Sequence, residues 1–201
     1  GPDEPGRRAA PLPDHGWQPI VHTVHQRANL QTNEGQLRDN PDDVIVKRAF
    51  ALDTARHLSL RGAYPGFLAL PDRWSSWWLG AVPAGLRLIR QYAPDIIWST
   101  YPIATAHLIG LTLHRLSGIP WIADFRDSMT EDDYPSDPTL RRVYRWIERE
   151  TVERSRYAVF TTPGVICMYA QRYPGVPASR WKKIENGYDE EDFQGGLDAP
   201  D

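Results

Sequence analysis

The sequence predicts an α/β domain built around a doubly wound parallel sheet. Short apolar runs that read as strands alternate along the chain with longer stretches of helical periodicity, which is typical of strand–helix–strand units. Several of these strands are apolar on both faces, as in parallel sheets that are covered by helices. The length of 201 residues suits one domain, or one large lobe of a two-lobed protein.

The composition excludes several classes of protein. Hydrophobic residues make up 41% of the chain and charged residues 24%, which argues against a disordered protein. Acidic residues outnumber basic ones by 26 to 23, so no nucleic-acid partner is expected. The single Cys167 excludes an intramolecular disulfide and a cysteine-based zinc cluster, and it fits a reducing compartment. No apolar run approaches the ~20 residues of a transmembrane helix, and we expect a cytoplasmic location.

Two strands and one long helix are expected in the first half of the chain. The sequence predicts a strand at residues 18–25 and a loop in the polar stretch that follows it. Residues 43–51 are a second strand candidate, and a short amphipathic segment is the alternative. Residues 53–72 contain several Gly and Pro, and their pattern is compatible with either a short helix or a loop. A helix follows from Asp72, which can act as its N-cap, and Pro83 should kink or split it. The apolar face of this helix consists of Trp74, Trp77, Trp78, Ala81, Gly85, Leu88, Ile89 and Tyr92.

The tryptophan stripe on this helix (Trp74, Trp77 and Trp78) has two interpretations. We favour packing into the core. The alternative is peripheral contact with the inner face of a membrane, because Arg73, Arg87 and Arg90 lie near the stripe and can face an anionic leaflet.

Strands and helices alternate strictly in the second half of the chain. Ala93-Pro94 marks a turn before the first strand, and Gly118 followed by Pro120 ends the first helix. Pro138 opens the next helix, since proline is tolerated in a first helical turn. The predicted strands cover 95–100, 121–125, 157–162 and 181–185, and the predicted helices cover 103–116, 138–151 and 163–173.

Ligands of doubly wound sheets bind beyond the carboxyl ends of the strands, so the segments that follow strands are the candidate site. The densest polar group among them is Asp124-Phe125-Arg126-Asp127. An arginine there can bind a phosphate or a carboxylate through two N–H groups, and an aspartate can orient a sugar hydroxyl or act as a base. The alternative is an Asp124–Arg126 ion pair that closes the strand. The four segments are Ser99–Tyr101, Asp124–Asp127, Thr161–Gly164 and Asn186–Asp189.

Two further groups can meet an anion. Thr100-Tyr101-Pro102 leads from a strand into a helix whose N-terminus attracts negative charge, unless it is only an ordinary turn. Arg7 and Arg8 follow Gly6 and can meet phosphates, although a frayed, solvated terminus is the default interpretation.

The sequence predicts no metal site. His22 and His25 are three apart on a strand, so their side chains point to opposite faces. His107 and His114 can share a helical face, but no acidic partner stands at a fitting offset, and we expect ordinary core or surface histidines.

Several short motifs together resemble a known family. Most of the resemblance is carried by Asp95–Pro102 (DIIWSTYP) and Gly118–Asp127 (GIPWIADFRD). Residues 95–193 resemble the N-terminal domain of family 4 glycosyltransferases, which have the GT-B fold, and are most similar to bacterial exopolysaccharide or colanic-acid-type members. Further matching segments are Gly6-Arg7-Arg8, His15-Gly16-Trp17, Glu148, Thr161-Thr162-Pro163 and Asn186-Gly187-Tyr188-Asp189.

The resemblance implies the organisation of the chain. Residues 1–189 would be the Rossmann-like N-terminal domain of the GT-B fold, on the acceptor side, and 190–201 the start of the interdomain linker. The family begins with a strand before its glycine-rich loop, whereas this sequence starts inside that loop, so we expect a fragment that lacks the first strand. We expect the C-terminal donor domain to be missing from this chain, and the chain alone to be inactive.

The resemblance also implies a function in polysaccharide or glycolipid synthesis. A hexosyltransferase of this kind moves a sugar from a nucleoside-diphosphate sugar to a hydroxyl or lipid-linked acceptor, and it retains the anomeric configuration. No metal or other cofactor is expected, because arginine, lysine and helix N-termini can stabilise the departing diphosphate.

The resemblance assigns roles to individual residues. Arg126 and Asp127 would be catalytic residues of the cleft, with Asp124 as the second choice. Arg7 and Arg8 would approach the donor phosphates, and Tyr101 would line the acceptor side. The remaining substrate-binding candidates are Thr100, Thr162 and Asn186.

Two alternative functions remain open at this point. One is a non-catalytic module that binds a sugar, a lipid or another protein. The other is a lobe of a sugar-nucleotide epimerase, which shares the GT-B architecture.

Overall fold

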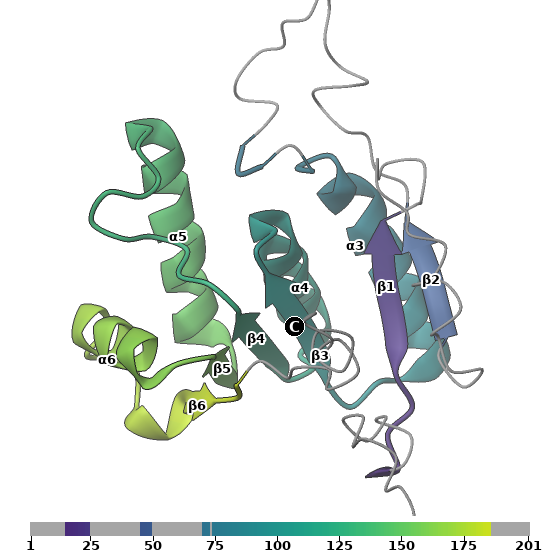
Figure 1. Cartoon of the computed structure of the whole chain (residues 1–201). Helices are drawn as coiled ribbons and strands as arrows, with labels where there is room; N and C mark the ends of the chain where they lie inside the picture. The colour runs from purple at the N-terminus through teal and green to yellow at the C-terminus, as the bar shows by residue number, and fades with distance from the viewer. Residues whose placement is uncertain (1–14, 25–44, 50–69, 73, 186–201) are drawn as a thin grey trace, which may run out of the picture.

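The described part of the computed structural model is an α/β arrangement in which every strand pairing is parallel (Figure 1). It comprises residues 15–24, 45–49, 70–72 and 74–185. The α/β class and the parallel pairing that the sequence predicts are therefore confirmed. The strands are β1 (Ile20–Val24), β2 (Ile45–Ala49), β3 (Ile97–Tyr101), β4 (Trp121–Phe125), β5 (Tyr157–Phe160) and β6 (Trp181–Lys183), and the helices are α3 (Trp77–Tyr92), α4 (Ala104–Ser117), α5 (Pro138–Arg154), α6 (Pro163–Arg172) and the 3-10 turn η4 (Ala178–Arg180).

The strands form two sheets within the described residues. β1 pairs with β2, and the larger sheet has the order β3-β4-β5-β6. Its register places Tyr101 beside Phe125, and Phe125 beside Phe160. Each connection within the larger sheet carries a helix, as parallel neighbours require. The carboxyl ends of β3, β4 and β5 consequently meet at one edge.

Local sequence signals fix most helix ends. Asp137 accepts a hydrogen bond from the N–H of Leu140 at 2.6 Å and Pro138 stands in the first turn, so α5 begins where the proline predicts. Thr162 and Pro163 start α6 in the same manner. Gly118 ends α4 with a φ of 75°, a left-handed conformation that favours glycine.

The helix around Pro83 begins later than predicted. Asp72 accepts the N–H of Trp74, but residues 74–76 form turns, and the α-helix begins at Trp77. The helix continues through Pro83, so of the two predicted effects of this proline a split does not occur. Because Pro83 has no N–H, only the helical hydrogen bond to the carbonyl of Leu79 is lost. Both residues are exposed, so water can donate a hydrogen bond to that carbonyl instead.

Aromatic side chains of α4 and α6 pack on one face of the larger sheet. The ring of Phe125 lies 4.7 Å from that of His107, 5.0 Å from Phe160 and 5.4 Å from Tyr169. Ile147 and Val152 of α5 belong to the same core cluster. This packing fixes the strand ends relative to the helices that follow them.

The tryptophan stripe packs mainly into a second core between α3 and α4. Trp74 and Trp77 are 7% and 8% exposed, whereas Trp78 is 36% exposed and donates from Nε1 to Thr112 at 3.0 Å. The core interpretation is therefore confirmed for the first two tryptophans. No helix in the described ranges combines the length and hydrophobicity needed to cross a bilayer.

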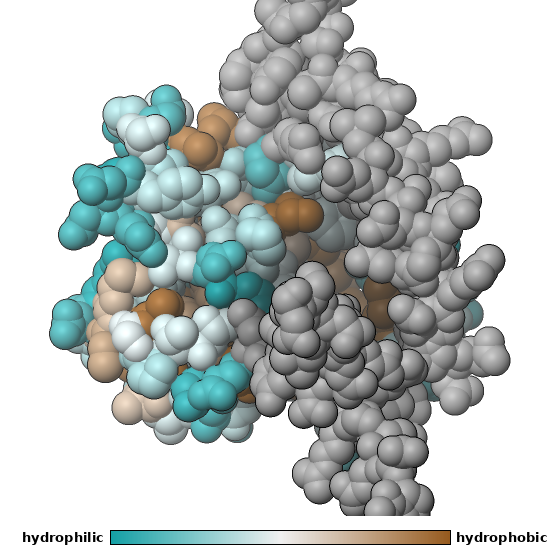
Figure 2. All heavy atoms as spheres, viewed as in Figure 1, coloured by the Kyte–Doolittle hydropathy of each residue, from teal (hydrophilic) through white to brown (hydrophobic). Residues whose placement is uncertain are grey.

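The surface formed by α5 and α6 is mostly hydrophilic on the face shown in Figure 2. In Figure 2, hydrophobic side chains form small separate brown areas among teal and white ones, over the region that α5 and α6 occupy in Figure 1. Arginines that the sequence places on one side of α5, Arg145 and Arg149, are exposed.

Candidate functional site

The candidate site is an edge of the larger sheet that we call the rim: Thr100, Arg126, Asp127, Thr161 and Thr162. Strand pairing places Thr100 beside Asp124, and residues 126 and 161 directly follow the paired ends of β4 and β5. Thr161 Oγ1 donates to the backbone carbonyl of Arg126 at 3.4 Å. The segments that follow β3, β4 and β5 are far apart in the sequence, but they lie together at this edge of the sheet.

An ion pair stands at the centre of the rim. Arg126 Nε donates to Asp124 Oδ2 at 3.0 Å, and the side chains are 49% and 5% exposed, respectively. The alternation of a strand puts residues 124 and 126 on the same side, which makes the pair possible. The buried carboxylate orients the guanidinium, which retains a positive charge at the rim. Asp124 therefore acts on Arg126, and its own access to a substrate is small.

The other rim side chains carry hydroxyls and one carboxylate. Asp127, Thr100 and Thr162 are exposed. Thr162 also caps α6, accepting a hydrogen bond from the N–H of Val165 at 3.4 Å. A permanent cation beside a carboxylate and several hydroxyls can bind a phosphate and hydroxyl groups of one ligand.

Tyr101 lies beneath the rim rather than on it. It is 3% exposed, and its ring stacks on His107 with centroids 6.2 Å apart. Burial, followed by Tyr144 and Tyr134, raises the pKa of Tyr101 far above its usual value, so the hydroxyl stays protonated. Both of these tyrosines lie close to its hydroxyl. The predicted role in lining the acceptor side therefore needs a correction: the side chain supports the rim from below.

A buried carboxylate anchors the loop that follows β4. Glu148 of α5 is fully buried and accepts hydrogen bonds from Thr130 at 2.9 Å, Tyr169 at 2.9 Å, Arg172 at 2.7 Å and Tyr173 at 2.7 Å. All four donors lie on the loop or around α6. The network therefore fixes the segment that carries Arg126 and Asp127 against the two helices.

Two further contacts hold the same loop. Tyr169 OH accepts the N–H of Met129 at 3.1 Å, and burial together with Glu148 raises the pKa of Tyr169 well above 10. Arg141 donates to the carbonyls of Asp132 at 2.6 Å and Pro135 at 2.7 Å. The loop is consequently attached to α5 and α6 on both sides of Glu131.

The N-terminus of α4 is not available to an external anion, which corrects the expectation drawn from Thr100-Tyr101-Pro102. Asp72 accepts the N–H of Thr105 at 2.8 Å and its hydroxyl at 2.9 Å. The carboxylate of the chain itself therefore occupies the position that a ligand phosphate would take. The sequence marks Asp72 as a cap, and its carboxylate does accept the N–H of Trp74 in the turns before α3, but the sequence does not show that the same carboxylate also caps α4.

His107 and His114 have structural roles. His107 is fully buried, with Nδ1 2.8 Å from Ser99 Oγ, and His114 Nδ1 lies 2.7 Å from the carbonyl of Ile119. In the described part of the chain, no group of three or more His, Cys, Asp or Glu side chains is arranged to hold a metal ion.

Three predicted binding residues, Arg7, Arg8 and Asn186, lie outside the described residues. Sequence reasoning missed the contribution of Asp72 to α4 and the tyrosines below the rim. It named Glu148 only as part of a resemblance. A glutamate inside the apolar face of a predicted helix is the signal that could have marked it as a buried hub.

The profile of a protein family described as "Glycosyl transferase 4-like domain" matches residues 6–187. No curated protein matches the sequence. Among solved structures, that of Glycyrrhiza uralensis UGT73P12 complexed with glycyrrhetinic acid 3-O-monoglucuronide is similar, with a TM-score of 0.47 and 14% identity. That match covers 88% of this chain and 44% of the other, so the chain spans less than half of that structure.

Proposed function

Because the chain belongs to the glycosyl transferase 4-like domain family, we propose that its rim forms one wall of the cleft of a retaining hexosyltransferase. The donor is a nucleoside-diphosphate sugar, and the acceptor is a hydroxyl of a saccharide or a lipid-linked saccharide. The place of action is the cytoplasm, in polysaccharide or glycolipid synthesis. The observation that carries this proposal is the Asp124–Arg126 ion pair at the carboxyl ends of the strands.

The chemistry requires charge stabilisation. Transfer breaks the bond between the sugar and the diphosphate, and negative charge develops on the departing phosphate oxygen. Arg126, oriented by the buried Asp124, supplies a fixed positive charge that needs no reorganisation during the reaction. In this proposal no metal ion takes part, because guanidinium and backbone N–H groups perform the same electrostatic role.

The remaining rim residues act on the sugar hydroxyls. Asp127 accepts hydrogen bonds from hydroxyls, and the exposed Thr100 and Thr162 can both donate and accept them. Arg7, Arg8 and Asn186 keep their predicted roles at the donor as part of this proposal. A second lobe would complete the donor site, and this lobe alone is proposed to be inactive.

Product analysis of the intact gene product tests the proposal. The enzyme is incubated with a panel of nucleoside-diphosphate hexoses and saccharide or lipid-linked acceptors, and products are identified by mass spectrometry and by anomeric coupling constants. We expect a new glycoside with the anomeric configuration of the donor, together with free nucleoside diphosphate. An epimerised nucleotide sugar without a glycoside would contradict transfer, and saturable donor binding without turnover would favour a binding module.

A further inference from the structure

A second polar site lies at the opposite edge of the sheet, at the amino ends of β5 and β6. It is an open hollow of about 550 Å³, which we call the cationic hollow. Four cationic side chains and one carboxylate contribute to its lining. The lining residues are Glu153, Arg154, Ser155, Arg156, Tyr157, Pro177, Ser179, Arg180 and Lys182.

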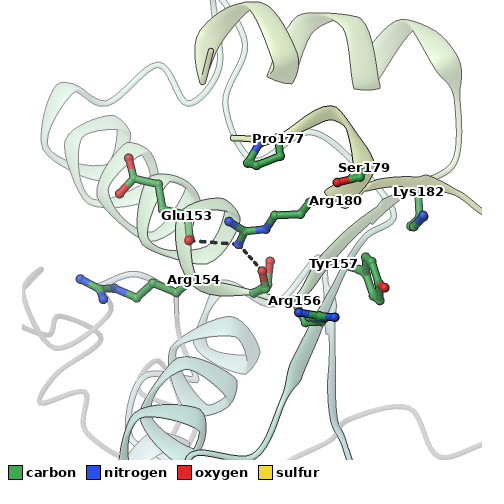
Figure 3. A pocket seen from close by; sticks show the side chains of 9 residues that line it. Glu153, Arg154, Arg156, Tyr157, Pro177, Ser179, Arg180 and Lys182 are labelled. Atoms are coloured by element: carbon green, nitrogen blue, oxygen red, sulfur yellow. Dashed lines mark hydrogen bonds between the residues drawn. The ribbon is translucent and has the colours of Figure 1, made fainter. Parts of the chain in front are cut away.

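The pairing of β5 with β6 brings the cations together. Ala158 pairs with Trp181 and Val159 with Lys182, so Arg180 and Lys182 stand beside the start of β5, where Arg156 is located. Figure 3 shows Arg180 extending across the hollow to the end of α5, with Arg156 and Lys182 in the same wall region as Tyr157. Residues more than twenty positions apart thus share one concave surface.

Three of the four cations have no carboxylate partner among the described residues. Arg154 pairs with Glu150 at 2.8 Å. By contrast, Arg156 and Lys182 lie over the ring of Tyr157, at 5.8 and 5.0 Å from its centroid. Arg180 uses Nη2 to donate to the backbone carbonyls of α5 and its cap: Val152 at 3.1 Å, Glu153 at 3.0 Å, and Ser155.

The surroundings of Arg180 favour an anion in the hollow. The carbonyls fix its guanidinium, while Nε and Nη1 donate to none of the residues described in the structure. Burial and the like charge of Arg156 lower the pKa of Arg180. A bound anion would relieve the repulsion between these two cations.

A buried hydroxyl supplies an independent observation. Ser155 is 1% exposed and belongs to the lining of the hollow. Its Oγ is buried and has no hydrogen-bond partner in the part of the chain that the structure describes. A buried hydroxyl without a partner is unfavourable, so this donor beside the hollow is left for a group that the described residues do not supply.

From these observations we infer that the cationic hollow binds a phosphate group. Two guanidinium groups and an ammonium group match the charge and the donor geometry of a phosphate better than those of a monovalent carboxylate. The source of the phosphate is a soluble phosphate compound or the headgroup of an anionic lipid. The site is separate from the rim, because β5 runs between the two edges of the sheet.

Pyrophosphate binding and vesicle flotation, both in 150 mM NaCl, test this inference on the intact protein. The test variant is Arg156→Ala/Lys182→Ala. The control is Arg142→Ala/Arg149→Ala, which removes the same charge from exposed positions of α5. We expect the test variant to bind pyrophosphate about tenfold more weakly, as measured by calorimetry, while the control binds like the wild type. A third variant, Arg126→Ala, separates the two sites. It should weaken pyrophosphate binding only at the rim and leave the binding that depends on Arg156 and Lys182 unchanged.

The vesicle arm distinguishes the two sources of phosphate. Two results together would assign a lipid headgroup. The protein floats with phosphatidylglycerol vesicles but not with phosphatidylcholine vesicles, and the test variant loses this flotation. The hollow does not bind pyrophosphate. Pyrophosphate binding without flotation would assign a soluble phosphate compound. The inference is overturned if the test variant equals the wild type in both assays, or if the control variant loses as much binding as the test variant.

Discussion

Asp124 and Arg126 form a 3.0 Å ion pair at the end of β4 in which the carboxylate is buried and the guanidinium is half exposed. Burial of the aspartate limits its contact with a substrate, whereas the arginine reaches the surface of the rim. In this pair, Asp124 therefore positions Arg126, and Arg126 is the residue that can contact a substrate.

This division predicts non-additive kinetics. Asp124→Asn removes the charge that orients Arg126, and we expect kcat/KM of the intact enzyme to fall about tenfold. In a variant that already carries Arg126→Ala, the same change should have almost no further effect, because its target is gone. Steady-state kinetics of the two single variants and the double variant measure this coupling. Full additivity would show that Asp124 acts independently of Arg126.

The hydrogen-bond network around Glu148 predicts a large loss of stability when the charge of this carboxylate is removed. Glu148→Gln removes the charge partner of Arg172 and turns an amide N–H₂ toward groups that are themselves donors. We expect the free energy of unfolding to fall by roughly 3–5 kcal/mol, measured by urea denaturation. Arg149→Gln, which also removes a charge but at an exposed position of the same helix, is the control and should change it by less than about 0.5 kcal/mol. Equal stabilities of the two variants would mean that the network does not hold the loop.

His107 predicts a defined pH dependence of stability. Burial lowers the pKa of His107 from 6.5 to about 3, so below pH 6.5 the unfolded state binds a proton that the folded state does not. Stability is therefore lost as the pH falls from about 6.5 toward 3, with a slope of up to about 1.4 kcal/mol per pH unit from this group.

The comparison of wild type with His107→Leu isolates that slope, because other groups titrate in both proteins. We expect the difference in unfolding free energy between them to change with pH over this range and to become constant near pH 3. His15→Ala, at an exposed position, should leave the wild-type profile intact. A difference that does not vary with pH would mean that His107 titrates normally.

Gly110 predicts a steric limit in the core. A Cβ there would lie 2.6 Å from Trp121 Nε1 and 3.0 Å from Ser99 Oγ, two atoms that form a 2.8 Å hydrogen bond. Gly110→Ala should cost about 1–3 kcal/mol in urea denaturation, despite the higher helix propensity of alanine. Gly164→Ala is the matched helical control, since nothing lies within 4 Å of its added Cβ. A stabilised Gly110→Ala protein would show that Trp121 can move without cost.

The sequence was sufficient for the elements whose signals are local. The segment Trp121–Phe125 is a strand with the predicted bounds, and Pro138 and Gly118 mark helix ends as expected. Predicted strands that run to Thr162 and Glu185 end earlier, at Phe160 and Lys183, because pairing with a neighbouring strand, rather than residue type, decides where a strand stops.

Features that depend on distant contacts could not be predicted. Nothing in the sequence near Asp72 shows that its carboxylate reaches Thr105, thirty-three residues away. Tyr101 follows the predicted strand 95–100 in the manner of a site residue, but in the structure it is the last residue of β3, and its buried ring stacks on His107. The cationic hollow likewise exists only because β5 and β6 are adjacent.

The most direct test of the proposed rim is the kcat/KM of Arg126→Ala in the intact enzyme, with Arg149→Ala as the control for loss of an exposed arginine. Loss of one fixed positive charge at the departing phosphate should reduce kcat/KM on the order of 10²-fold, with an unaffected control. Because Arg126→Ala also leaves the buried Asp124 carboxylate without its partner, kcat/KM is measured at a temperature at which circular dichroism shows the variant to be folded. An Arg126→Ala enzyme with wild-type kcat/KM would contradict the assignment of this edge as the cleft wall.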